Sequence, residues 1–132
     1  MYYFNKMIMT DPATMITEPI NFFVIFSSLN IRYPKKSHNV IEFTTDVTFE
    51  EYSRNKILRF AVIKNLEIIG EAAYLITKEF REEHQEIAWN EVIGMRHVLV
   101  HGYYQIRDEI VWGTIQTDLF PLKDKIERLI CK

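Results

Sequence analysis

Residues 55–82 have the sequence NKILRFAVIKNLEIIGEAAYLITKEFRE, in which apolar side chains return every three or four positions. This spacing matches the turn of an α-helix, about 3.6 residues, so it predicts one long helix from Asn55 to about Glu82 with a buried stripe. The small residues Gly70, Ala72 and Ala73 would let another helix approach closely at their level. The stretch is therefore expected to form the central helix of the fold. The stripe consists of Leu58, Val62, Leu66, Ile69, Ala73, Ile76 and Phe80.

Two patterns before this stretch predict further helices. Residues 35–44 suit a short amphipathic helix whose apolar members are Val40, Ile41 and Phe43. Residues 48–51, Thr-Phe-Glu-Glu, have the form of a capping box, in which the Thr hydroxyl and the Glu carboxylate each accept a free backbone N–H. A helix should therefore begin near residue 49.

The C-terminal third continues the helical pattern after a polar break at residues 82–86. Trp89 opens a helix that runs to Tyr103, and Asp108 is a candidate N-cap for a last helix, which Pro121 should kink or split. We expect an all-α, up-and-down bundle of four to five helices over residues 38–132, with an irregular N-terminal segment over residues 1–37. The last helix should bury Val111, Trp112, Ile115 and Leu119 and continue with Leu122, Ile126 and Leu129.

Composition limits the class of protein. With 132 residues, 48% of them hydrophobic, the chain can bury the core of one domain. The formal net charge of -2 argues against coating nucleic acid by bulk electrostatics, so any RNA contact should be local. The single cysteine, Cys131, has no partner for an intrachain disulfide or a thiolate metal site, which favours a reducing, cytoplasmic setting.

No membrane segment is expected either. The longest apolar run, residues 20–26, is too short to cross a bilayer. Asp11 and Glu18 precede it without a basic lead, which argues against a signal peptide.

Residues 95–104, MRHVLVHGYY, gather side chains that move protons and bind phosphates. On an ideal helix Arg96 and His101 are about 140° apart, whereas Arg96 shares a face with Tyr103. His97, His101 and Tyr104 lie on a neighbouring face. The length of the Arg96 side chain, or loosening of the helix near Gly102, could bring Arg96 and His101 to one pocket.

These side chains suit metal-independent cleavage of RNA. Imidazole can take the proton of a 2'-hydroxyl, and a guanidinium can stabilise the charge that develops on phosphorus. Because one His101 cannot easily act as both base and acid, a two-fold dimer would supply two copies across one cleft. From spacing alone, however, such a helix is more often half-buried packing with satisfied hydrogen bonds.

The motif resembles that of a known superfamily. Residues 94–103 are similar to the HEPN signature, Arg followed by four to six residues and His, in the form with Tyr two places further on that characterises HepT-like toxins of HEPN/MNT toxin-antitoxin pairs. Residues 65–73, residues 87–89 followed by residues 93–96, and Val111-Trp112 also resemble the family pattern, so the resemblance runs from about His38 to Ile130. His97 stands where the family most often has Asn, and residues 1–37 do not resemble its first helix.

The resemblance implies an all-α HEPN bundle, usually a homodimer, with Arg96 and His101 as a metal-independent ribonuclease site at the dimer cleft. It implies no cofactor and no metal. It also implies a nucleotidyltransferase antitoxin that adds AMP to the motif tyrosine, here Tyr103. Phosphates on Tyr103 would fill the cleft and compete with RNA for Arg96.

Two residues could support this site, each with a plainer alternative. His97 could orient the cleft or bind substrate, or make an ordinary polar surface contact. Glu71 could pair with Arg96, or be a solvated helix carboxylate. A zinc site formed by His38, His84, His97 and His101 is disfavoured because their spacing suggests no shared site.

Two other functions remain open. The chain could be a non-catalytic helical partner and substrate of the nucleotidyltransferase. Alternatively, it could be an RNA- or nucleotide-binding HEPN module that does not cleave.

Overall fold

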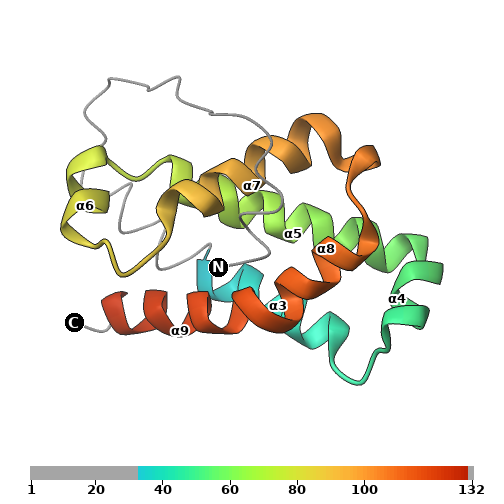
Figure 1. The fold of residues 1–132 in the computed structure, drawn as a ribbon. Coiled ribbons are helices and arrows are strands. Elements are labelled where there is room, and N and C mark those ends of the chain that lie inside the picture. Colours follow the sequence, from blue (N-terminus) through green and yellow to red (C-terminus); the bar gives the residue numbers. More distant parts are fainter. Residues whose placement is uncertain (1–32, 131–132) are drawn as a thin grey trace.

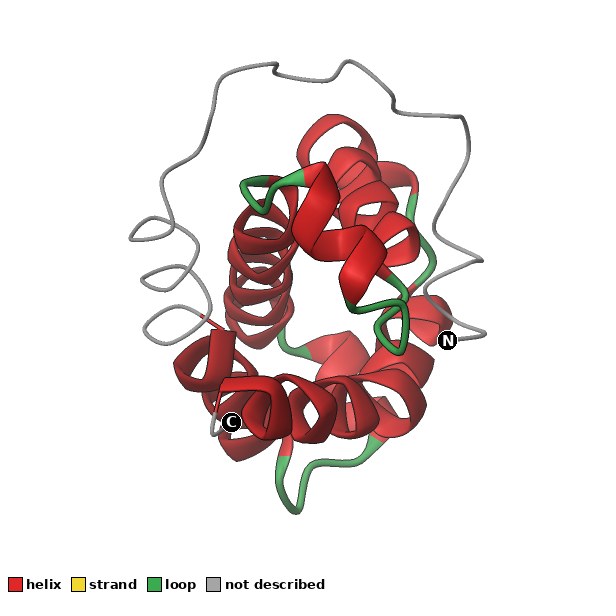
Figure 2. Cartoon of the chain, turned by 90° about the vertical axis from the view of Figure 1, so that its left-hand side faces the viewer, coloured by secondary structure: helices red, strands yellow, loops and turns green. Residues whose placement is uncertain are grey.

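The computed structural model describes residues 33–130, and all regular secondary structure in that range is helical (Figures 1 and 2). The long helices alternate in direction along the chain (Figure 1), and α5 packs against both α3 and α7 while α3 also packs against α9. The expected all-α, up-and-down bundle is therefore confirmed. The long helices are α3 (Tyr33–Thr44), α5 (Lys56–Tyr74), α7 (Trp89–Gly102) and α9 (Leu119–Ile130).

Shorter elements join the long helices. They are α4 (Phe49–Arg54), α6 (Lys78–Glu83), the 3-10 turn η2 (Tyr103–Gln105), α8 (Asp108–Gly113) and the π-helical turn η3 (Thr114–Asp118). The expected irregular segment falls mostly on residues 1–32, which lie outside the described residues. Helix α3 runs across the domain boundary expected after residue 37, and that boundary stays a prediction.

The core follows the apolar stripe expected on the central helix. Val62, Leu66, Ile69 and Ala73 of α5 are fully buried. Partners from α7 and the C-terminal helices close over them, which fixes α7 against α5 and so places the Arg-His-Tyr motif. These partners include Val92, Met95, Leu99, Val111, Ile115, Leu119, Leu122 and Ile126.

The central helix is shorter than the sequence predicts. We expected one helix to about Glu82, but α5 ends at Tyr74 and α6 starts at Lys78. Thr77 is extended, and its hydroxyl accepts the Phe80 N–H at 3.3 Å, so it caps a new helix instead of continuing the old one. The prediction of a single helix was therefore wrong at this point.

The capping box at the start of α4 is confirmed. The Thr48 hydroxyl accepts the Glu51 N–H at 3.2 Å, and the Glu51 carboxylate accepts the Thr48 N–H at 2.8 Å. The hydrogen bonds that the Glu51 carboxylate accepts from the N–H and the hydroxyl of Thr48 hold the pKa of Glu51 below its usual 4.5. Because a lowered folded-state pKa favours the ionised form, the stabilisation is present at neutral pH and is lost as the pH falls through that pKa.

We therefore expect Glu51→Gln to unfold at a lower temperature than the wild type at neutral pH, with the two converging in acid. Thermal unfolding over a pH series measures this difference. Thr48→Ser keeps the hydroxyl and the N–H, so it should keep the wild-type pH profile. A Glu51→Gln deficit that persisted unchanged below the lowered pKa would contradict the assignment.

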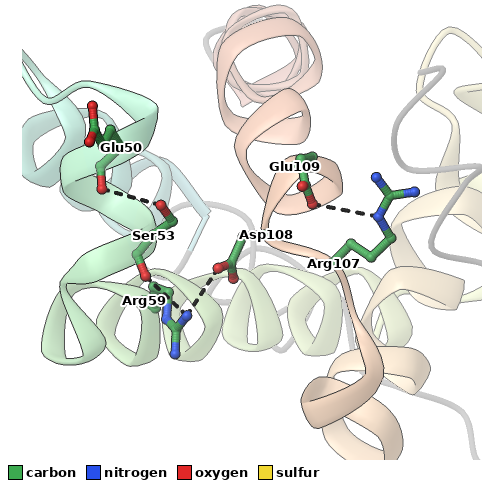
Figure 3. A network of polar contacts seen from close by, with 6 residues as sticks. All are labelled: Glu50, Ser53, Arg59, Arg107, Asp108 and Glu109. Atoms are coloured by element: carbon green, nitrogen blue, oxygen red, sulfur yellow. Dashed lines mark hydrogen bonds and ion pairs between the residues drawn. The ribbon is translucent and has the colours of Figure 1, made fainter.

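Asp108 is not the N-cap that the sequence suggested. Arg107 holds the cap position without a side-chain cap hydrogen bond, and Asp108 is the first residue of α8. Its carboxylate accepts from Arg59 of α5 at 3.0 Å, while the same Arg59 nitrogen donates to the Ser53 carbonyl at 3.2 Å (Figure 3). Burial, and secondarily the Asp108 charge, raise the pKa of the nearby Tyr52 phenol. The acidic side chain thus ties α8 to α5 instead of capping its own helix.

Pro121 acts through the turn before it. α8, η3 and α9 follow one another without a loop, and the π-helical turn Thr114–Asp118 lies just upstream of the proline. A proline cannot donate to the carbonyl four residues back, here that of Thr117, and its ring presses on that carbonyl. A π-helical turn relieves this pressure by widening the helix. The expected splitting of the last helix therefore takes the form of a π-helical turn.

No helix within residues 33–130 is both long and apolar enough to cross a membrane.

Candidate functional site

The motif occupies the second half of α7. Trp89 anchors the start of this helix, because its buried indole N–H donates to the His84 carbonyl at 2.8 Å. The helix stays α-helical through His101 and Gly102, and the chain tightens into the 3-10 turn η2 only from Tyr103. The helix thus does not loosen near Gly102, so no such change brings Arg96 and His101 to one side. Arg96 and His101 accordingly keep the separate directions of a regular helix.

Arg96 lies against α5. A Cβ built on Gly70 would stand 2.4 Å from the Arg96 Cβ and 3.1 Å from the Arg96 Cα. The backbone of α5 at Gly70 therefore lies directly against the Cα and Cβ of Arg96 on α7. The Arg96 guanidinium carbon lies 5.1 Å from the centroid of the Tyr74 ring. Within residues 33–130, no carboxylate forms an ion pair with Arg96. Its positive charge is thus held on an aromatic face and is not neutralised by an acidic group of this part of the chain.

The two histidines form a pair on the face predicted for them. The ring centroids of His97 and His101 are 4.8 Å apart, with an interplanar angle of 54°. His97 is half-buried and His101 is exposed. Tyr104, expected on this face, is 72% exposed. An exposed imidazole of this kind can reach a substrate without any rearrangement of the core.

The two other predicted residues are not placed together with these. Glu71 is exposed, and no ion pair joins it to Arg96 in the described part of the chain, as expected for a solvated carboxylate. The side chain of Tyr103 lies outside the described residues, and only its backbone position at the start of η2 is defined. The structure thus brings His97 beside His101 and directs Arg96 towards α5.

Tyr74 was missed by reasoning from the sequence. It stands four positions after Gly70, so the two share one face of α5. That spacing could have indicated Tyr74 as a contact residue. Gly70 marks the point where a second helix comes close, and Tyr74 lies one turn further along the same face of α5. What the sequence could not supply was which residue of α7 meets Gly70.

The remaining polar groups that could build a site lie elsewhere. Burial raises the pKa of Glu91 near the start of α7, and the nearby Asp118 charge raises it further. His84 packs its ring on Phe80 at 4.4 Å. Among residues 33–130, no group of three or more His, Cys, Asp and Glu side chains is arranged to hold a metal ion. Arg96, His97 and His101 on α7 are therefore the candidate site residues.

Comparison with known proteins identifies the class of this helical arrangement. Residues 35–129 match the family model described as "Ribonuclease HepT-like". The chain belongs to the HepT-like ribonuclease family of the HEPN superfamily. The fold and the ribonuclease class expected from the motif are therefore confirmed at the level of the family.

Named relatives of this HepT-like chain are similar over most of their length. "Putative RNase MJ1380" of Methanocaldococcus jannaschii is 39% identical over 93 residues, which cover 70% of this chain and 85% of the relative. "Probable ribonuclease HepT" of Thermococcus cleftensis is 42% identical over 88 residues, covering 67% of this chain and 80% of the relative. The chain has no significant match among solved structures.

Proposed function

We propose that this HepT-like protein is a toxin that acts as a metal-independent endoribonuclease, with Arg96 and His101 carrying the reaction. The observation that carries this proposal is that α7 of a HepT-like fold presents an arginine without an acidic partner and an exposed histidine. Arg96 is a cation without an acidic partner in the described part of the chain, and His101 is an exposed imidazole on the same helix. Together they are the cation and the base that phosphodiester cleavage requires.

The nucleophile in this reaction is the 2'-hydroxyl of the RNA, next to the phosphate at which the chain is cut. The neutral His101 imidazole takes the proton of the 2'-hydroxyl, and the 2'-oxygen forms a bond to phosphorus as the bond to the 5'-oxygen breaks. The leaving 5'-oxygen takes up a proton from an imidazolium, and the products are a 2',3'-cyclic phosphate and a 5'-hydroxyl. Arg96 stabilises the added negative charge on the phosphoryl oxygens through paired N–H donors.

A second copy of the chain completes this site in our proposal, because Arg96 and His101 of one copy point in different directions. Exposed apolar side chains support such a pairing. Ile57 and Phe60 of α5 are 82% and 46% exposed, and Val100 and Tyr104 are 43% and 72% exposed. α5 and α7 run in opposite directions (Figure 1), so the start of α5 and the end of α7 lie at the same end of the bundle. Burying these four residues between two copies would bring both His101 side chains to one interface.

We further propose that a nucleotidyltransferase antitoxin silences the toxin by adding AMP to Tyr103. The motif tyrosine follows His101 by two residues, so phosphates attached there would lie close to the reacting groups and carry negative charge into the place of RNA. Incubation with the antitoxin and ATP should add mass in units of AMP to the wild type and not to Tyr103→Phe. Tyr104→Phe is the matched control and should still be modified.

RNA cleavage in the presence of EDTA tests the proposed activity directly. We expect purified protein to cut RNA at the same rate with and without the chelator and to leave 2',3'-cyclic phosphate ends. Loss of cleavage in EDTA would contradict the metal-independent reaction. Saturable RNA binding without cleavage would favour a binding module, and AMP addition without RNA turnover would favour a non-catalytic partner of the antitoxin. A monomer at the active concentration in light scattering would contradict the shared cleft.

A further inference from the structure

We propose that Tyr74 is a positioning residue that holds the Arg96 guanidinium in the orientation needed to bind the reacting phosphate. The inference rests on the proposed function of Arg96. It starts from one juxtaposition, the guanidinium carbon of Arg96 on α7 lying 5.1 Å from the ring centroid of Tyr74 on α5. A cation over an aromatic face at this distance is attracted by the ring.

The arrangement of α5 makes this contact specific. Gly70 gives room for the Cα and Cβ of Arg96, which a Cβ at residue 70 would meet at 3.1 and 2.4 Å. Tyr74 follows one helical turn later on the same face of α5. The Arg96 side chain therefore runs along α5 from Gly70 at its base to Tyr74 at its head. One helix supplies both the space and the support.

The Tyr74 ring is itself held in place. Its side chain is half-buried and packs against the hydrophobic core. A fixed ring restricts the rotamers of a long arginine side chain that would otherwise lose that freedom only when RNA binds. Preorganised charge of this kind stabilises a transition state without reorganisation during the reaction.

An aromatic support differs in one chemical respect from an acidic one. The N–H donors of a guanidinium lie in its plane, whereas the ring contacts its flat face. Stacking therefore leaves the donors able to bind two phosphoryl oxygens. A carboxylate partner would occupy these donors and cancel the charge that the reaction needs. Tyr74 thus orients Arg96 without competing for it.

Substitutions that remove or keep the ring test the proposal. We expect Tyr74→Leu to lower kcat/KM for RNA roughly tenfold, the upper range of a partly buried cation–ring contact, mainly through kcat. Tyr74→Phe keeps the ring and should rescue activity to within about twofold. Tyr74→Met, which fills similar space without an aromatic face, should behave like Tyr74→Leu and carries the test if the leucine variant does not fold. Equal activity of the leucine, methionine and phenylalanine variants would overturn the role of Tyr74.

A double-mutant cycle separates positioning from a loss of stability. In an Arg96→Lys background, Tyr74→Leu should cost clearly less than its tenfold effect in the wild type, because the flat guanidinium is already gone. An undiminished tenfold loss in that background would show that Tyr74 acts through the fold and would overturn the proposal.

An NMR measurement keeps this inference distinct from the proposed function. The ring should shift the side-chain proton resonances of Arg96, and the shift should survive Tyr74→Phe and disappear in Tyr74→Leu. No RNA cleavage by the wild type would overturn the proposed function, whereas the ring-dependent shift would still decide whether Tyr74 orients Arg96. Cleavage that depends on Arg96 without that shift would overturn the Tyr74 proposal alone.

Discussion

Replacing His101 with alanine is expected to lower the rate of RNA cleavage about 100- to 10,000-fold, the usual contribution of a positioned acid or base. The imidazole is the group to which the proposed mechanism gives the proton of the 2'-hydroxyl. Because His101 is exposed and its ring contact is with His97, the variant should keep the fold and the melting temperature of the wild type. Initial rates on a labelled RNA, with circular dichroism of the same samples, measure both effects.

A second exposed histidine supplies the control for this prediction. Among the described residues, His38 on α3 forms only a surface pair with Glu42 at 3.9 Å, and pairs of this kind add little stability. His38→Ala should therefore cleave RNA at the wild-type rate. Wild-type cleavage by His101→Ala would remove His101 from the mechanism, and an equal loss in both variants would point to a general effect of removing a surface histidine.

Local sequence signals predicted the helices wherever the signal and the packing agreed. The capping box at Thr48 and the stripe through Val62, Leu66 and Ile69 follow from hydrogen bonding and helical period, and both are present in the structure. The stripe alone could not locate the end of α5, because Ile76 continues the apolar spacing and is buried although it lies in the break between α5 and α6. Thr77 decides the boundary by capping the next helix. A cap of this kind can end one helix and start the next even where the apolar spacing continues across the boundary.

The candidate site was predictable only as far as one helix extends. The His97–His101 contact follows from a spacing of four residues on α7, and the structure confirms it. The place of Arg96 on Tyr74 depends on which turn of α5 meets α7, and only three-dimensional packing fixes that meeting. Asp108 shows the same limit, since its pairing with Arg59 joins positions far apart in the chain. Long-range partners, unlike helix faces, are not encoded in local spacing.

Gly70→Ala is expected to destabilise the fold by roughly 1–3 kcal/mol, the usual cost of overpacking a close contact. Helix propensity alone predicts the opposite sign, because alanine in a helix interior is favoured over glycine by about 1 kcal/mol. The contact decides the sign, since the new Cβ would stand 2.4 Å from the Arg96 Cβ and 3.1 Å from the Val92 carbonyl oxygen. These atoms belong to the base of a side chain and to the backbone of α7, so they can yield only if the helices separate. Chemical denaturation measures the difference.

Gly102→Ala is the matched control, because a Cβ at Gly102 meets no atom within 4 Å and the described glycines have no positive φ. It should be as stable as the wild type or slightly more so. If Gly70→Ala matched it, the close approach of α5 and α7 would be refuted. Where Gly70→Ala remains folded, moving α7 outward would also lift Arg96 from Tyr74. RNA cleavage should then fall by more than the unfolded fraction of the protein accounts for. Such a result would mean that the lack of a side chain at Gly70 determines both the packing of α5 against α7 and the orientation of Arg96.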